Sequence, residues 1–195
     1  GDVDLDKLEA KIKEHFNSAK AKTNPRERKV FEVPNHEKTL VSVETDKEAT
    51  FNQVQVMYKD KGLPKTETTL EDYRKSIVKG LFSQMINNRL RELTNSENPP
   101  FVFGSSFYGS TWARSKNAYQ SRAMSSPTGQ LTALKTLLEE NERVKRHGFQ
   151  KGEFERAKTA ILARMDKAFQ NKDKNESDRY VGEYVRNFLE KEPIP

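Results

Sequence analysis

Three histidines are the only residues of this chain that could place imidazole nitrogens on a metal ion, and the sequence contains no cysteine. They are His15, His36 and His147, far from one another, and none lies in an H-x-x-E-H or H-E-x-x-H arrangement. A zinc centre needs such ligands clustered at suitable spacing. The sequence therefore predicts no metal site, no thiol nucleophile and no disulfide in this chain.

The segment FGSSFYGS, residues 103–110, contains glycines and serines, as do nucleophile loops and phosphate-binding loops. Its glycines and serines do not have the spacing that either kind of loop requires. The pattern G-x-S-x-G requires a second glycine where Tyr108 stands. The pattern G-x-x-x-x-G-K-[S/T] fits Gly104 and Gly109, but Ser110 occupies the lysine position. We interpret the glycines and serines as strand residues that permit close packing, and we predict no catalytic residue.

Two arginines, Arg89 and Arg91, stand near the end of a stretch with helical periodicity. Either guanidinium could bind a carboxylate or carbonyl group of a peptide. The structural alternative is that basic residues near the end of a helix complement the helix dipole. Both interpretations stay open at this point.

Apolar residues at helical spacing predict helices that could position these side chains, in segments 2–16, 69–94, 127–148, 153–169 and 179–189. Asp4 is expected to cap the first helix, and Gly148 is expected to end the third. In the third helix four apolar residues are expected to face the core, namely Leu131, Leu134, Leu138 and Val144.

The long central helix, 69–94, begins after turn residues. A capping box can form there between Thr68 and Glu71 or between Thr69 and Asp72. After the fourth helix, the polar run 170–179 is expected to act as a linker before the last helix.

Extended segments are expected at 29–33, 38–45 and 50–59. In the last of these, Val54, Val56 and Tyr58 alternate with Gln53, Gln55 and Met57. Two further strands are expected around a turn near 115–117, with Trp112 and Tyr119 on them and in the core. Alternation of this kind is typical of an antiparallel sheet with one covered face. We predict an α+β fold, an antiparallel sheet with helices layered on one face, in a single domain spanning 1–195 that is a fragment of a larger protein.

Composition excludes few classes of function. The chain has 35 Lys and Arg against 29 Asp and Glu, a net charge of +6, and the two signs are interleaved throughout. A nucleic-acid arm would show a block of like charge, so a basic nucleic-acid-binding module is the weaker alternative. We expect no membrane span, because no apolar run approaches the required length, and no signal peptide in the acidic first residues.

Three stretches in a fixed order resemble the second, zinc-free domain of the pitrilysin/insulinase family of zinc metallopeptidases, which includes the mitochondrial processing peptidases. They are GDVDLDKLEAKIKEHF, INNRLREL with the following PPF, and ALKTLLEENERVKRHGFQKGEFERAKTAILARM. In that family a Gly-Asp-hydrophobic-Asp run opens a helix, as residues 1–4 would here. The resemblance covers nearly the whole chain.

This resemblance implies a domain duplicate that shares the α+β fold of the catalytic domain but lacks its ligands. Zinc would be held by an H-x-x-E-H motif and a distant glutamate in the other domain of the parent enzyme, so we expect no cofactor in this chain. The two domains would enclose a chamber for extended peptides. The expected partners are therefore the zinc-binding domain, in the same or a partner chain, and an extended peptide substrate, with no nucleic acid.

Some members of the family contact substrate through an arginine after the long helix and a tyrosine a few residues on. Arg91 aligns with that arginine. Seven residues after Arg91, where the resemblance would place a tyrosine, this chain has Asn98, and the first tyrosine after Arg91 is Tyr108. Our candidate substrate-binding residues are therefore Arg91, Arg89 and Tyr108, and none is expected to be catalytic.

The leading hypothesis is a noncatalytic substrate-chamber domain of a zinc metalloendopeptidase, inactive when alone. The alternative is an inactive scaffold or assembly domain of the same fold. The resemblance favours the bacterial periplasm or cell envelope as the location, and the cytoplasm stays open.

Overall fold

The computed structural model describes the following residues: 3–20, 22–27, 29, 31–61, 69–113 and 115–194. The chain divides into two compact units, Gly1–Phe31 and Glu32–Pro195, and each is described here by itself.

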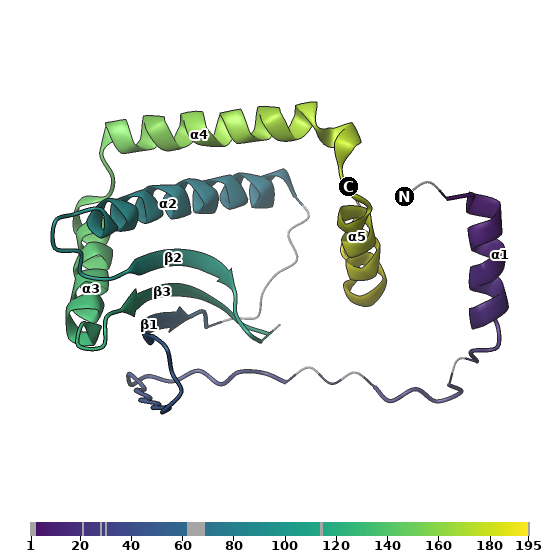
Figure 1. Ribbon diagram of the computed structural model, residues 1–195, viewed down its shortest axis with the longest axis horizontal. Helices are drawn as coiled ribbons and strands as arrows, with labels where there is room; N and C mark the ends of the chain where they lie inside the picture. Colours follow the sequence, from purple (N-terminus) through teal and green to yellow (C-terminus); the bar gives the residue numbers. More distant parts are fainter. Residues whose placement is uncertain are drawn as a thin grey trace. The chain divides into compact units, whose positions relative to one another are not determined.

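The first unit contains helix α1, Leu5–Phe16 (Figure 1). Asp4 is its N-cap, as expected, because the Asp4 side chain accepts a hydrogen bond from the backbone N–H of Lys7 at 3.1 Å. Residues 1 and 2, the Gly-Asp pair of the expected motif, lie outside the described residues. The apolar stripe of α1 is exposed within the described residues, and it consists of Leu5, Leu8, Ile12 and Phe16.

The second unit is built around a three-stranded antiparallel sheet in the order β1-β3-β2. Its strands are β1, Asn52–Lys59, β2, Phe103–Ser110, and β3, Asn117–Ser125. Val56 of β1 lies opposite Ser121 of β3, which lies opposite Ser106 of β2. The strand expected at 50–59 and the later pair of strands are confirmed.

Two expected strands are wrong in the described chain. Residues 29 and 31–33 form no strand, and residues 38–45 form none either, whereas residue 30 lies outside the described part. Val, Phe and Thr favour an extended chain, but a strand exists only where its backbone groups meet a partner strand. In 38–45 the apolar side chains of Leu40, Val41 and Val43 remain exposed.

The turn between β2 and β3 is longer than expected and contains Trp112. The Thr111 hydroxyl donates to the backbone C=O of Lys116 at 2.8 Å, which closes the turn. Trp112 is 79% exposed, so its expected place on a strand in the core is wrong. Tyr119 does lie on β3 and is half-buried, and its hydroxyl donates to the side chain of Asn141 at 2.7 Å.

The helices of this unit follow the expected order. They are α2, Leu70–Thr94, α3, Gln130–His147, α4, Lys151–Gln170, and α5, Ser177–Glu190, with the short 3₁₀ helix η1, Lys172–Lys174, between the last two. Of the two possible capping boxes, the one between Thr69 and Asp72 is present, whereas Thr68 lies outside the described residues. Gly148 ends α3 with a φ of 64°, a conformation that favours glycine.

Helices α2 and α3 pack on the same face of the sheet, and α4 lies along α2 (Figure 1). Two residues of the covered face, Val54 and Ala123, lie opposite each other and contact this layer. The helices contribute Leu90 and Leu137 to the same core. The structure therefore confirms the expected fold, an α+β arrangement with helices layered on one face of an antiparallel sheet.

The face of α3 that enters the core differs from the expected one. Ala133, Leu137 and Glu140 are buried, whereas Leu131 is 81% exposed and Leu138 is 40% exposed. The buried residues lie at spacing i, i+4, i+7 and share one face of α3, whereas Leu131, Leu134 and Leu138, at spacing i, i+3, i+7, share another. The small Ala133 lets the buried face approach the sheet, with Leu137 beside it in the core. The expectation was wrong for Leu131 and Leu138, while Leu134 and Val144 are half-buried.

Close packing explains part of the FGSSFYGS segment. A Cβ atom at Gly104 would lie 2.6 Å from the ring of Phe101, which is itself buried. The hydroxyls of Ser106 and Ser121 lie 2.7 Å apart in the covered face, and both residues are fully buried. Small residues at these positions therefore let the sheet, α2 and the preceding loop meet.

Candidate functional site

Arg89 of α2 lies against the elbow between α3 and α4. Its Nε and Nη2 donate to the two carboxylate oxygens of Glu153, at 2.6 and 2.8 Å. Nη2 also donates to the backbone C=O of Gly148 at 3.1 Å, and the guanidinium stacks 4.9 Å from the centre of the Phe149 ring. On the side of α3, Nη1 lies 3.7 Å from Oε2 of Glu140. Arg89 therefore joins three helices.

The pair between Arg89 and Glu153 is largely removed from water, with 16% of each side chain exposed. The hydrogen bond from Arg89 is the main reason that the pKa of Glu153 falls to about 2. The backbone N–H of Gln150, 2.7 Å from Oε2 of Glu153, acts in the same direction. The same pair raises the pKa of Arg89. The charge of Arg89 is thus matched inside the domain.

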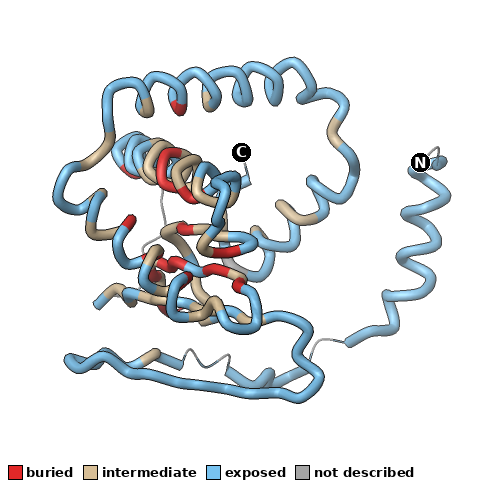
Figure 2. Tube along the Cα trace, turned by 60° about the vertical axis from the view of Figure 1, so that its left-hand side comes forward, coloured by how far each residue is buried: buried red, intermediate tan, exposed pale blue. Residues whose placement is uncertain are grey.

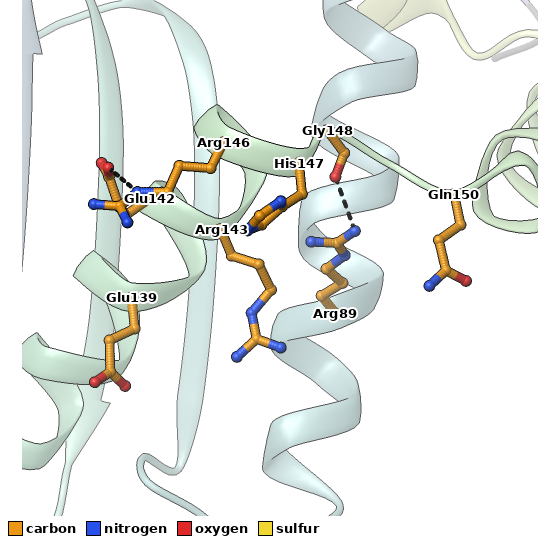
Figure 3. A pocket seen from close by; sticks show the side chains of 8 residues that line it. All are labelled: Arg89, Glu139, Glu142, Arg143, Arg146, His147, Gly148 and Gln150. Carbon is orange, nitrogen blue, oxygen red and sulfur yellow. Dashed lines mark hydrogen bonds and ion pairs between the residues drawn. The ribbon is translucent and has the colours of Figure 1, made fainter.

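A hollow of about 590 Å³ opens at the same elbow, between the last turns of α3 and the start of α4 (Figure 3). Arg146 Nε lies 2.6 Å from Oε1 of Glu142, and Arg143 Nε lies 2.9 Å from Oε1 of Glu140. Arg146 lowers the pKa of Glu142 by its hydrogen bond. Because cations and carboxylates alternate here and are paired, the hollow does not present one sign of charge to a ligand.

Tyr108 of β2 is also engaged within the domain. Its hydroxyl donates to the carboxylate of Asp60, which follows β1, and Nζ of Lys79 lies 5.0 Å from the ring centre. The hydrogen bond to Asp60, together with partial burial, raises the pKa of Tyr108. Tyr108 thus connects the end of β1 to β2 beneath α2.

Arg91 differs from the other two candidates, because its side chain is exposed and forms no hydrogen bond or ion pair within the described part of the chain. Arg89 and Arg91 are two residues apart and point to different sides of α2. Tyr108 lies beside Lys79, which is about 15 Å along the helix from Arg89. The structure does not gather the three residues into one site. Their binding of substrate stays a prediction.

A further polar contact, between Asn87 and β2, was not expected from the sequence. Ser106 donates its backbone N–H to Oδ1 of Asn87 at 2.9 Å, and Nδ2 of Asn87 donates to the backbone C=O of Ser106 at 2.6 Å. Nδ2 also donates to the backbone C=O of Ser83. A polar residue between Ile86 and Leu90, on the side of α2 that meets the sheet, is the signal that could have indicated this role.

The face of the sheet opposite α2 and α3 carries polar and charged side chains at its centre. Gln55 donates to the side chain of Gln120 at 2.8 Å, and Arg122 donates to the hydroxyl of Ser105 at 3.2 Å. The guanidinium of Arg122 is exposed and lies 5.9 Å from the centre of the Phe107 ring. We call these five residues the open face.

The sequence profile of the family described as "Peptidase M16 inactive domain" matches residues 1–161. The chain belongs to this family. The resemblance to the zinc-free domain of the pitrilysin/insulinase peptidases is therefore confirmed.

The chain spans less than half the length of each of the following relatives, which are longer proteins. The "Zinc protease PQQL-like" of Arabidopsis thaliana is 27% identical over 184 residues, which are 94% of this chain and 16% of that relative. The periplasmic protease PqqL from Escherichia coli shares the fold with a TM-score of 0.69 and 17% identity, over 100% of this chain and 21% of that chain. A predicted insulinase family protease from Yersinia pestis shares it with a TM-score of 0.69 and 16% identity, over 95% of this chain and 39% of that chain.

The described residues of this M16 inactive domain do not fit a zinc centre. No three His, Asp or Glu side chains cluster as metal ligands in the ranges that the structure describes. Nδ1 of His36 lies 2.7 Å from the backbone C=O of Lys38, and His147 lines the hollow at the elbow. Among the described helices, none combines the length and the apolar character needed to cross a membrane.

Proposed function

We propose that this M16 inactive domain forms part of the peptide-holding chamber of a zinc metalloendopeptidase and supplies no catalytic group. The observation that carries the proposal is the match of residues 1–161 to the inactive-domain profile. A relative named as a zinc protease supports it, and so does the poor fit of the described residues to zinc. Zinc is held by another domain of the same or a partner chain.

The open face is the surface that we assign to the chamber wall. Helices cover the other face of the sheet. On the open face the side chains of Gln55 and Arg122 are exposed and can meet a peptide, whereas Gln120 is buried. Arg122 is its exposed charge. A fixed charge on a chamber wall favours peptides of opposite charge and disfavours peptides of like charge. The domain would therefore influence which peptides enter without taking part in bond cleavage.

The catalytic part of the proposal is tested by comparing the complete protein with the separate 195-residue chain. The complete protein is expected to cleave an extended fluorogenic peptide and to lose this activity when zinc is chelated. The separate chain is expected to cleave nothing and to bind no stoichiometric zinc. Zinc binding and peptide cleavage by the separate chain would overturn the proposal. A zinc-loaded complete protein that cleaves no peptide would favour the scaffold alternative.

The chamber role is tested by reversing the charge of the open face in the complete protein. Arg122→Glu is expected to raise KM for acidic peptides and to lower KM for basic ones, each by about threefold to tenfold. The matched control is Arg164→Glu on α4, where the arginine donates to the side chain of Gln84 at 2.8 Å in the helical layer. Equal behaviour of the two variants would remove the open face from the chamber.

A further inference from the structure

A small pocket lies beneath the last turns of α3, between this helix, α2 and β3. Its volume is about 160 Å³. Buried positions of this unit gather mainly in the sheet, in α2 and in the earlier part of α3, and no residue of α3 beyond Glu140 is buried (Figure 2). The last turns of α3 therefore leave room beside the sheet. The residues that line this room are Phe82, Tyr119, Asn141, Val144 and Lys145.

Aromatic rings form one wall of the pocket. The rings of Phe82 and Tyr119 meet edge to face, with their centres 5.9 Å apart and their planes at 74°. Phe82 meets Phe149 in the same way, with the ring centres 5.6 Å apart. Edge-to-face contact is a favoured arrangement of aromatic rings, so the Phe82 ring is held in place from two directions. Apolar cavities of about 150 Å³ in other proteins bind benzene. The pocket therefore has the volume and the wall for a single aromatic ring.

Asn141 supplies a hydrogen-bond donor to the pocket. Its Oδ1 accepts a hydrogen bond from the Tyr119 hydroxyl at 2.7 Å, which fixes the orientation of the carboxamide. Its Nδ2 is buried and meets no hydrogen-bond partner among the described residues. Because a buried donor without an acceptor is unfavourable, a ligand that presents an oxygen atom to Nδ2 is favoured.

Lys145 adds a positive charge at the rim of the pocket. Its side chain is 79% exposed, and its Nζ lies 3.8 Å from Oε2 of Glu142. Glu142 is engaged more closely by Arg146, at 2.6 Å. An exposed pair of this length contributes little, so Lys145 can exchange it for the carboxylate of a ligand.

We propose that this pocket binds a small aromatic carboxylate. The ring of the ligand fills the space beside Phe82 and Tyr119, and its carboxylate accepts a hydrogen bond from Asn141 and pairs with Lys145. Two sources offer this chemistry, namely a free aromatic acid and the carboxyl-terminal Phe residue of a peptide. The pocket lies on the helix-covered side of the sheet, so the proposal does not depend on the chamber role, which concerns the opposite face.

Titration of the 195-residue chain with 3-phenylpropionate, followed by NMR, tests the proposal. Saturable shifts of the Tyr119 and Asn141 amides are expected, with a Kd of about 1 mM for a ligand of about eleven non-hydrogen atoms. The uncharged 3-phenylpropionamide has the same ring and size and is expected to bind at least about fivefold more weakly, because it lacks the charge that pairs with Lys145. Absence of saturation up to about 20 mM 3-phenylpropionate overturns the proposal, and so do equal affinities for acid and amide.

Two variants test the assigned contacts. Asn141→Asp replaces the donor by a carboxylate of the same shape that can still accept from Tyr119, and it is expected to weaken binding of 3-phenylpropionate at least about tenfold by repulsion. Lys145→Gln is expected to weaken it about threefold to fivefold. The matched control is Lys135→Gln, another exposed lysine of α3 at 3.8 Å from a glutamate, and it is expected to bind as wild type does. Amide shifts of β1 that match those of wild type show that each variant is folded, and unchanged affinity of Asn141→Asp overturns the proposal.

A short peptide that ends in Phe distinguishes the two sources of the ligand. Binding at least about tenfold tighter than that of 3-phenylpropionate, lost when the peptide is amidated at its carboxyl end, assigns the pocket to peptide ends. Binding no tighter than that of 3-phenylpropionate assigns it to free aromatic acids, and either result supports the shared chemistry. No cleavage is measured, so failure of the chamber role leaves this proposal standing, and failure of this proposal leaves the chamber role standing.

Discussion

Asn87 on α2 hydrogen-bonds both backbone groups of Ser106 on β2, at 2.9 and 2.6 Å. The carboxamide therefore takes the place that a residue of a neighbouring strand would take on the outer edge of β2. An uncovered edge strand is a template for pairing with another chain, and β2 contains neither a charged residue nor proline to discourage this. The Asn87 side chain thus occupies the outward backbone groups at the middle of β2 and keeps another strand from pairing there.

Replacing Asn87 with alanine is expected to lower the free energy of unfolding by about 1–3 kcal/mol, because the N–H and C=O of buried Ser106 lose their partners. Chemical denaturation of the 195-residue chain measures this. The control is Asn88→Ala, since among the described residues the Asn88 side chain accepts a hydrogen bond only from the Gln84 side chain on the same helix. Equal destabilisation by the two variants would contradict the role of Asn87. Asn87→Ala is also expected to self-associate more readily through β2.

Glu153→Gln is expected to destabilise the domain at pH 7 by about 1–2 kcal/mol, since a charge-assisted pair with Arg89 is lost and solvent screens part of its strength. The pKa of Glu153 lies at about 2 in the folded chain, against an ordinary value of 4.5. The unfolded chain therefore takes up the proton first as the pH falls. The contribution of Glu153 is complete above about pH 5 and is lost between pH 4.5 and 2.

Unfolding free energies measured from pH 7 to 3 check this pH dependence. The difference between wild type and Glu153→Gln should shrink steadily below pH 5. Glu142→Gln is the control, because the pair between Glu142 and Arg146 is exposed and should contribute little at any pH in this range. A difference that stays constant down to pH 3 would mean that the ionised pair is not what stabilises the elbow.

The orientation of α3 can be tested with two neighbouring leucines. Leu137 is fully buried, so Leu137→Ala is expected to cost about 2–5 kcal/mol of stability. Leu138 is 40% exposed, and Leu138→Ala is expected to cost less than about 1 kcal/mol. Thermal or denaturant unfolding of the separate chain gives both values. The reverse order would show that α3 meets the sheet with the other face.

Arg91 is the candidate substrate contact whose guanidinium remains unpaired in the described chain. If it binds a peptide carbonyl or carboxylate and the complete protein cleaves peptides as proposed, Arg91→Ala in the complete protein should lower kcat/KM by about tenfold, through a higher KM or a lower kcat. Arg74→Ala provides the control, because Arg74 is also exposed on α2 but lies near its other end. Steady-state kinetics that match those of wild type would leave Arg91 without a role in substrate binding.

Contacts between distant segments could not be predicted from the sequence. Arg89 looked like a helix-end cation or a substrate ligand, but its partner Glu153 lies 64 residues away along the chain. The segment 38–45 is rich in Val and Thr, as strands often are, yet β1 is the one that pairs with β3. Leu137 and Leu138 are both apolar, and only the approach of Ala133 to the sheet selects Leu137 for the core.

Local interactions let the sequence alone determine much of this protein. The caps at Asp4 and Thr69, the helix end at Gly148 and the helical periods act within a few residues, so they define the helices before any tertiary contact forms. Only the tertiary structure decided which face of each helix is buried, which extended segments pair, and which charges are matched. These depend on the burial of apolar surface and on backbone pairing between segments far apart, which no local pattern encodes.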